Sequence, residues 1–185
     1  MISPILLISG STRAGSVNTA VIATVADLVK APFTTNIYDE LGELPHFNPD
    51  LDHDPLPEKV VRLRAAIQNA SALLISTPEY AGAMPGALKN LLEWTVGGVE
   101  ISGKPTAWIN PSTNPLRAKD TYASLAIVLG YTGAAVIGEA CGDIPVSRQS
   151  IHSDGLIHDE TVREAITKAL ASLAAATAVS GRPAG

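Results

Sequence analysis

The chain has 185 residues and a formal net charge of −5 at pH 7; 46% of its residues are hydrophobic and 17% are charged. This length suits a single α/β domain, which can bury a hydrophobic core of its own without disulfide bonds or metal ions. Lysine and arginine are scattered, and no apolar run reaches the length of a membrane span, so neither nucleic acid nor a membrane is an expected partner.

Apolar runs of strand length alternate along the chain with segments of helical period. Residues 5–9 and 72–76 are almost continuously apolar, which is typical of strands buried on both faces of a sheet. Val60, Leu63 and Ile67 recur on one face of a helix. In chain order we expect a strand over 5–9, a helix over 18–30, a strand over 34–38, a helix over 58–69, a strand over 72–76, a helix over 85–94, a strand over 106–110, a helix over 118–129, a strand over 134–137 and a helix over 159–180. Asp159 is placed to cap the N-terminus of the last helix.

The alternation of strands and helices predicts one flavodoxin-like, doubly wound α/β domain over residues 1–180, with a disordered tail over 181–185. Its parallel sheet has five strands in the order 2-1-3-4-5, with helices on both faces. Ligands of such sheets bind at the carboxyl ends of the strands, near the switch point between the first and third strands. We therefore expect a site among the loops that follow Ser9, Ser76 and Asn110.

The loop after the first strand combines glycines, hydroxyl side chains and one arginine at the start of a helix. Helix N-termini carry unpaired N–H groups and partial positive charge, so they attract phosphate. Ser11, Thr12 and Ser16 offer hydroxyl donors, Arg13 offers a fixed charge, and Asn18 can cap the helix or donate to a phosphate oxygen. The pattern is neither a Walker loop nor G-x-G-x-x-G. It predicts a phosphate site; the alternative is a turn whose Ser and Asn side chains bond only to backbone.

The loop after the third strand is restricted by proline and glycine. Pro78, Gly82, Pro85 and Gly86 limit or bend the backbone, and Tyr80 offers a flat amphipathic ring. Such a loop can present several backbone N–H groups to one edge of a flat ligand. Read by itself, it is equally consistent with a rigid turn and a helix cap.

The two loops together carry a specific pattern: Gly10-Ser-Thr-Arg13 with Ser16 and Asn18, then Pro78-Glu-Tyr80, Gly82, Pro85-Gly86, Leu88-Lys-Asn90 and Trp94. In this pattern the chain resembles the NADPH-dependent FMN reductase family, which includes quinone, azo-dye and chromate reductases. The resemblance extends in order and spacing over residues 4–175.

The resemblance implies bound FMN, reduction by NADPH or NADH, and a small-molecule electron acceptor such as a quinone. It also implies two-step turnover, in which reduced nicotinamide and acceptor use the same open ring face in turn, and a homodimer or homotetramer. No side-chain acid or base is required, so no catalytic residue is predicted. The residues implied to hold the FMN phosphate are Ser11, Arg13, Ser16, Val17 and Asn18. The residues implied to flank the isoalloxazine, mainly through backbone, are Pro78, Glu79, Tyr80 and Gly82.

The loop after the fourth strand departs from the family pattern. Relatives often carry a Gly-Gly pair at the positions aligned with Arg117 and Ala118, and Pro115 is an addition. Ser112 is available to the flavin edge. This departure bears on flavin affinity and on acceptor choice. Two alternatives to the enzyme stay open: a flavodoxin-like electron carrier, and a flavin-free regulatory or nucleotide-binding relative, which this departure suggests.

Two further features bear on location and assembly. Cys141 is the only cysteine, so the chain cannot form an internal disulfide and a reducing, cytoplasmic compartment is the expected location; Cys141 itself is expected to be a small core residue. The loop over 40–57 is rich in proline and aspartate, and its His46 and Phe47 are candidates to cover the flavin of a neighbouring subunit. The apolar end of the helix over 85–94 is a candidate dimer contact.

Overall fold

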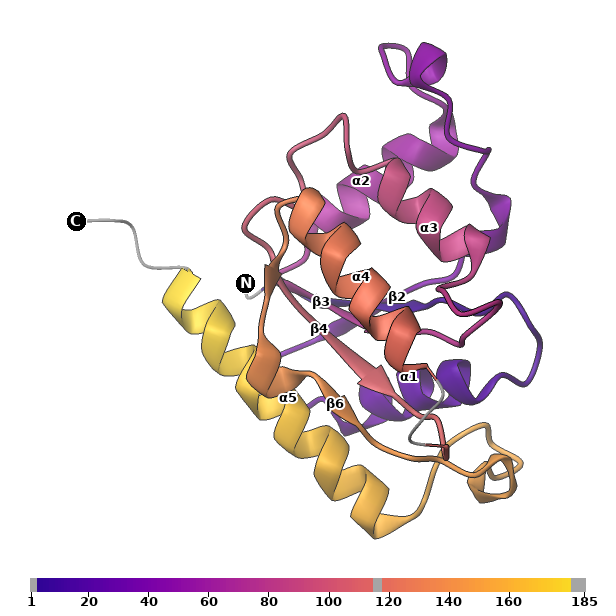
Figure 1. Cartoon of the computed structure of the whole chain (residues 1–185). Coiled ribbons are helices and arrows are strands. Elements are labelled where there is room, and N and C mark those ends of the chain that lie inside the picture. Colours follow the sequence, from indigo (N-terminus) through magenta and orange to yellow (C-terminus); the bar gives the residue numbers. More distant parts are fainter. Residues whose placement is uncertain (1–2, 115–117, 181–185) are drawn as a thin grey trace.

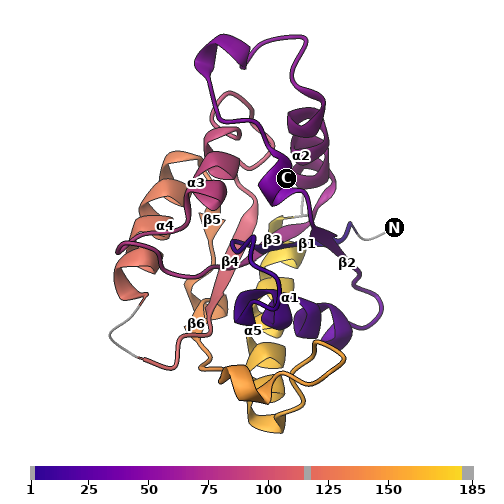
Figure 2. The same cartoon turned by 90° about the vertical axis from the view of Figure 1, so that its right-hand side faces the viewer.

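A parallel sheet lies between two layers of helices in the computed structural model, which describes residues 3–114 and 118–180 (Figures 1 and 2). The central strands run in the order β2-β1-β3-β4-β5, which confirms the predicted flavodoxin-like order. The strands are β1 (Ile5–Ser9), β2 (Thr35–Tyr38), β3 (Ala72–Ser76), β4 (Pro105–Asn110) and β5 (Ala135–Val136). The helices are α1 (Val17–Leu28), α2 (Glu58–Asn69), α3 (Gly86–Glu93), α4 (Lys119–Tyr131) and α5 (Glu160–Ser180). The tail predicted over 181–185 lies outside the described residues.

The side chains of β1 alternate between two hydrophobic cores, one on each face of the sheet. Leu6 and Ile8 join the core formed with α2, α3 and α4, whereas Ile5 and Leu7 join the core formed with α1 and α5. Because successive residues of a strand point to opposite faces, only a continuously apolar strand can fill both cores. The apolar run at the start of the sequence therefore predicts its central position correctly.

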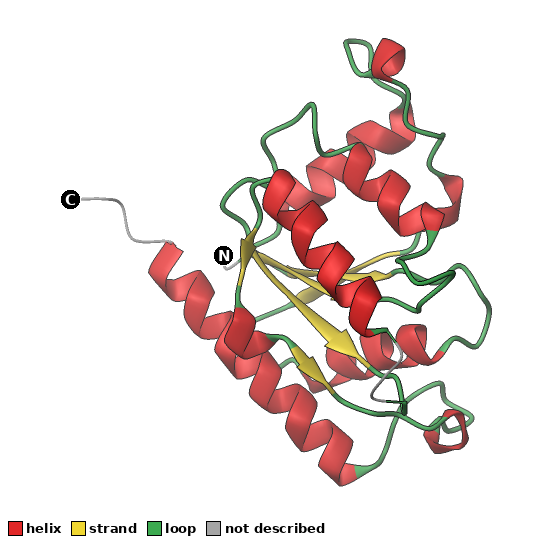
Figure 3. Cartoon of the chain, in the orientation of Figure 1, coloured by secondary structure: helices red, strands yellow, loops and turns green. Residues whose placement is uncertain are grey.

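Two short strands, β5 and then β6 (Gly142–Asp143), pair with β4 at the edge of the sheet where one strand was predicted (Figure 3). Beside β4, Ile137 N donates to Thr106 O at 2.9 Å and Ile144 N donates to Asn110 O at 2.9 Å. Carbonyls at alternate residues of a strand point to the same side, so β6 continues the line of β5 after a 3₁₀ turn at Gly138–Ala140. The prediction of one strand over 134–137 is wrong in extent, and β6 was not predicted. The chain therefore reaches the carboxyl edge of the sheet only after β6.

Local caps decide where the helices begin. Ser16 caps α1, because its Oγ accepts from Asn18 N at 3.2 Å, so Asn18 is a residue of the first turn rather than the cap. Pro85 directly precedes α3, and the Asp159 carboxylate accepts from Val162 N at 3.2 Å at the start of α5. The predicted cap at Asp159 is confirmed.

The long loop between β2 and α2 is attached to α3. Pro45 O accepts from Asn90 Nδ2 at 2.9 Å and from Trp94 Nε1 at 2.8 Å, and Phe47 N donates to Asn90 Oδ1 at 2.7 Å. The Phe47 ring lies edge-on to Trp94, with 5.0 Å between centroids. Phe47 is therefore engaged within its own chain, and of the two residues considered for covering a neighbour only His46 is exposed.

The apolar end of α3 is buried in the core of its own chain: Leu91, Leu92 and Trp94 are at most 1% exposed. These side chains are not available as a dimer contact, and that expectation is wrong. None of the described helices combines the length and apolar character needed to cross a bilayer.

Candidate flavin-binding site

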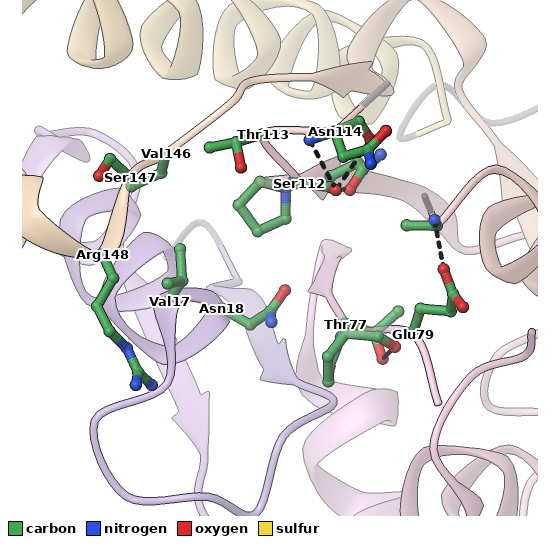
Figure 4. A pocket seen from close by; sticks show the side chains of 14 residues that line it. Val17, Asn18, Thr77, Glu79, Ser112, Thr113, Asn114, Val146, Ser147 and Arg148 are labelled. Atoms are coloured by element: carbon green, nitrogen blue, oxygen red, sulfur yellow. Dashed lines mark hydrogen bonds between the residues drawn. The ribbon is translucent and has the colours of Figure 1, made fainter. Parts of the chain in front are cut away.

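A cavity of about 450 Å³ opens at the carboxyl ends of β1, β3 and β4 (Figure 4). This is the sheet edge where the strand order predicts a ligand. Its wall is built from the first turn of α1, the loop after β3, the loop after β4 and the segment after β6. The lining residues are Val17, Asn18, Thr77, Pro78, Glu79, Asn110, Pro111, Ser112, Thr113, Asn114, Ala118, Val146, Ser147 and Arg148.

Asn18 contributes the first polar group of the wall. Its side chain is only 6% exposed, and Oδ1 accepts from Ser76 Oγ at 2.9 Å. That bond fixes the amide plane, and among the described residues none accepts from Nδ2. An amide N–H donor beside the open end of a helix suits a phosphate oxygen.

The other predicted phosphate ligands occupy the loop rather than the cavity wall. Ser11 Oγ accepts from Arg13 N at 3.3 Å, and Ser11 N donates to Ser9 Oγ at 3.3 Å. Ser16 caps α1, as described above, and Arg13 is exposed. Of the five residues predicted to hold phosphate, Val17 and Asn18 line the cavity and the other three do not.

The loop after β3 divides into a part that lines the cavity and a tight turn beyond it. Residues 77–79 line the cavity. Tyr80 N donates to Ala83 O at 2.9 Å and Ala83 N donates to Tyr80 O at 3.1 Å, with positive φ at Ala81 (53°) and Gly82 (75°). Two positive φ values match a two-residue type I′ turn. Tyr80 is 55% exposed, and neither Tyr80 nor Gly82 is among the lining residues.

Tyr122 supports the floor of the cavity from α4. Its buried hydroxyl lies 3.0 Å from Thr77 O and 2.9 Å from Ile109 O, and it accepts from Thr77 N at 3.3 Å. Burial raises the pKa of Tyr122, so the hydroxyl stays protonated and able to donate. A Cβ at Gly10 would collide with the Thr77 side chain, so the close approach of the first two loops requires glycine there.

The loop after β4 is held by its own side chains. Asn110 Oδ1 accepts from Ser112 N at 3.1 Å, and Asn110 Nδ2 donates to Asp143 Oδ1 at 2.8 Å. Ser112 lines the cavity as predicted, but its hydroxyl donates to Asn114 O at 3.1 Å. The predicted departures at Pro115 and Arg117 lie outside the described residues.

Glu79 connects the loop after β3 (the second loop) to the end of the loop after β4 (the third loop). Its Oε2 accepts from Ala118 N at 2.7 Å, directly before α4. Ala118 has a φ of 67° and no side-chain cap for the helix. This is the left-handed region that favours glycine, and Ala118 is one of the two positions where relatives often carry glycine. The Glu79 carboxylate satisfies the N–H of this N-cap residue, one of the donors that a helix start leaves unpaired.

The segment after β6 supplies three lining residues that were not predicted: Val146, Ser147 and Arg148. Arg148 Nη2 donates to Gly15 O at 3.2 Å and so links this segment to the first loop. The sequence signal was a polar Ser-Arg pair after the last strand, but the strand was predicted to end at Ile137. Arg148 was therefore not placed at the carboxyl edge.

The wall suits FMN in its chemistry. One part of it carries the α1 N-terminus, the amide of Asn18 and the guanidinium of Arg148, which fit a phosphate. The other part carries backbone and small side chains of the second and third loops, which fit the edge of a flat ring. Among the described residues, no group of three His, Cys, Asp or Glu side chains is placed to hold a metal ion.

Comparison with known proteins gives a consistent result. The model of a family described as NADPH-dependent FMN reductase matches residues 3–144. An NAD(P)H-dependent FMN reductase of Pseudomonas aeruginosa is 31% identical over 91% of this chain and 92% of its own length. A 2-hydroxy-1,4-benzoquinone reductase of a Burkholderia species is 31% identical over 86% of this chain and 88% of its own. The structure of a flavoenzyme NAD(P)H:(acceptor) oxidoreductase from Paracoccus denitrificans superposes with a TM-score of 0.76 at 26% identity, over 94% and 98% of the two chains.

Proposed function

Because the chain belongs to the NADPH-dependent FMN reductase family, an enzyme family that uses FMN and NAD(P)H, we propose that it transfers electrons from reduced nicotinamide to a quinone. The observation that carries the proposal is the cavity at the carboxyl edge of the sheet, which joins a helix N-terminus to two rigid loops in one wall. Relatives named as quinone reductases support this class of acceptor.

In the proposal, the cavity-lining residues hold FMN directly. Val17 and Asn18 receive the phosphate at the start of α1, and Pro78, Glu79 and Ser112 border the ring. The other predicted residues act indirectly or from the margin: Ser11, Ser16 and Gly82 shape the loops through local hydrogen bonds and turns, whereas Arg13 and Tyr80 lie exposed beyond the wall.

Bound FMN would supply the redox chemistry, which is hydride transfer from the nicotinamide and electron transfer to the acceptor. The protein's part is to bind, orient and restrict access. Tyr122 holds the ends of β3 and β4 together beneath the cavity, and Glu79 holds the second loop against the start of α4. In the proposal, the nicotinamide and the acceptor use the same part of the cavity in turn, so the nicotinamide would leave before the acceptor enters and turnover would follow a ping-pong scheme.

The first test is flavin binding and reduction. Purified protein is expected to show a flavin spectrum, or to bind added FMN in a one-to-one ratio, and to bleach when NADPH is added without oxygen. Initial rates measured against NADPH concentration, at several fixed quinone concentrations, should give parallel double-reciprocal lines. A colourless protein that does not bind added FMN indicates a flavin-free relative. Flavin that NAD(P)H cannot reduce indicates an electron carrier, and intersecting lines contradict the ping-pong scheme.

We also propose a homodimer or homotetramer in the cytoplasm. A two-fold assembly is the commonest closed arrangement, and large apolar side chains are exposed outside the cavity. The four most exposed are Val96, Val99, Ile127 and Tyr131, at 65%, 80%, 62% and 90% exposure. Light scattering at micromolar concentration should give twice or four times the 19.2 kDa of one chain. Detection in the membrane fraction after cell lysis would contradict the location.

A further inference from the structure

We propose that Arg148 supplies the fixed positive charge that binds the FMN phosphate. The inference rests on the proposed function, since it assumes that FMN occupies this cavity. Arg148 lies beyond the residues matched by the family model, which end at 144, and it is not among the residues that the family resemblance implies for FMN. The sequence favoured Arg13 for this role. Both arginines are exposed, but Arg148 lines the cavity and Arg13 does not.

Arg148 stands at the end of the cavity formed by α1. It lines the wall together with Val17 and Asn18, and Figure 4 shows its side chain beside Val17. Nη2 donates to Gly15 O at 3.2 Å, which draws the guanidinium to the loop in front of α1. A guanidinium has five N–H donors, and within the described chain no carboxylate pairs with Arg148. Donors therefore remain for an anion.

The backbone that carries Arg148 is well anchored. Val146 N donates to Pro111 O at 3.0 Å and Val146 is 4% exposed, so the ladder beside β4 continues to the cavity wall. Ser147 Oγ then accepts from Gln149 N at 3.3 Å and caps a short 3₁₀ helix that begins at Arg148. This places the arginine on a fixed segment and not at the tip of a free loop.

The charges of the cavity wall define a direction for the ligand. Among the lining residues, Arg148 and Glu79 carry charges at neutral pH, and they come from different parts of the wall (Figure 4). Glu79 is engaged with Ala118 N at the start of α4, whereas Arg148 lies beside the start of α1. A phosphate monoester carries nearly two negative charges and is attracted to an arginine and a helix N-terminus together. The phosphate therefore points toward α1 and the ring toward the second and third loops.

The test compares FMN with riboflavin, which lacks the phosphate. Apoprotein of the wild type, Arg148→Ala and Arg148→Lys is titrated with each flavin while its fluorescence is followed, and Arg13→Ala is titrated in parallel to test the arginine that the sequence favoured. A charge-assisted hydrogen bond corresponds to a loss of roughly ten- to a hundred-fold in FMN affinity for Arg148→Ala. Riboflavin affinity should change less than about twofold, and Arg148→Lys should recover part of the loss.

The outcomes separate the two proposals. If wild-type apoprotein binds neither flavin, the proposed function itself fails. If Arg148→Ala weakens riboflavin as much as FMN, Arg148 only fastens the first loop through Gly15 and the inference is overturned. It is overturned equally if Arg13→Ala causes the selective loss of FMN and Arg148→Ala does not.

Discussion

Removal of the Glu79 carboxylate should destabilise the protein by about 1–1.5 kcal/mol. Ala118 cannot cap α4 with its side chain, and Glu79 accepts at 2.7 Å from the N–H of Ala118, one of the unpaired donors at the start of the helix. Losing an N-cap costs about 1 kcal/mol, and a carboxylate at a helix N-terminus adds about 0.3–1 kcal/mol. Glu79 is exposed, so the second contribution belongs at the lower end of that range. For a chain of this size the change lowers the melting temperature by roughly 2–6 °C.

Thermal unfolding of Glu79→Ala, Glu79→Gln and the wild type measures this effect. Glutamine keeps an acceptor oxygen and loses only the charge, so Glu79→Gln should cost about 0.3–0.5 kcal/mol. Glu164→Ala is the matched control: Glu164 is exposed on α5 with no described partner, and it should change stability by less than about 0.5 kcal/mol. If Glu79→Ala and Glu164→Ala have the same melting temperature, the Glu79 carboxylate does not stabilise the start of α4 and the reasoning is wrong.

Three other substitutions test single features of the fold. Hydrogen bonds from Lys59 and then Arg62 hold the pKa of Glu40 below its usual value. The stabilisation that these hydrogen bonds give the fold is complete above the unfolded-state pKa of Glu40 and disappears as the pH falls through its lower folded-state pKa. Glu40→Gln should therefore flatten the acid side of a plot of melting temperature against pH. An unchanged plot would count against this network of hydrogen bonds. The Tyr38 hydroxyl is buried without a described partner, so Tyr38→Phe should be neutral or stabilise the fold by up to about 1 kcal/mol in urea unfolding, and a clear loss would reveal a missing partner. Ala118→Gly removes the strain of a positive φ and should raise stability by about 0.5–1 kcal/mol, whereas a lower melting temperature would mean that the strain is absent.

The sequence predicted those features that depend on local pattern. The apolar run over 5–9 identifies a central strand because both faces must be buried, and the cap at Asp159 is a short-range hydrogen bond. It did not predict β6, because a two-residue strand has no measurable periodicity. Its existence depends on pairing with Ile109 and Asn110, which are more than thirty residues away in the chain.

In the candidate site too, the sequence predicted local features but not those that depend on tertiary contacts. The loops were identified by composition and by family resemblance, but the direction of each side chain was not. Ser16 and Tyr80 turned out to be engaged in local hydrogen bonds, which any Ser or turn backbone can form. Arg148 reaches the cavity only because β6 redirects the chain, so its role depends on tertiary structure alone.

The interruption between β5 and β6 also bears on how the protein avoids association through its sheet. An exposed edge strand offers a continuous row of N–H and C=O groups that a strand from another molecule can extend. Here the row is broken, because Ala140 N and Cys141 N form local hydrogen bonds within the 3₁₀ turn, to Ile137 O at 2.9 Å and Gly138 O at 3.1 Å. Only two residues remain in ladder geometry on each side of the break. The edge that lies beside β4 is therefore a poor template for intermolecular β-pairing, and a variant that straightened it would be prone to aggregate.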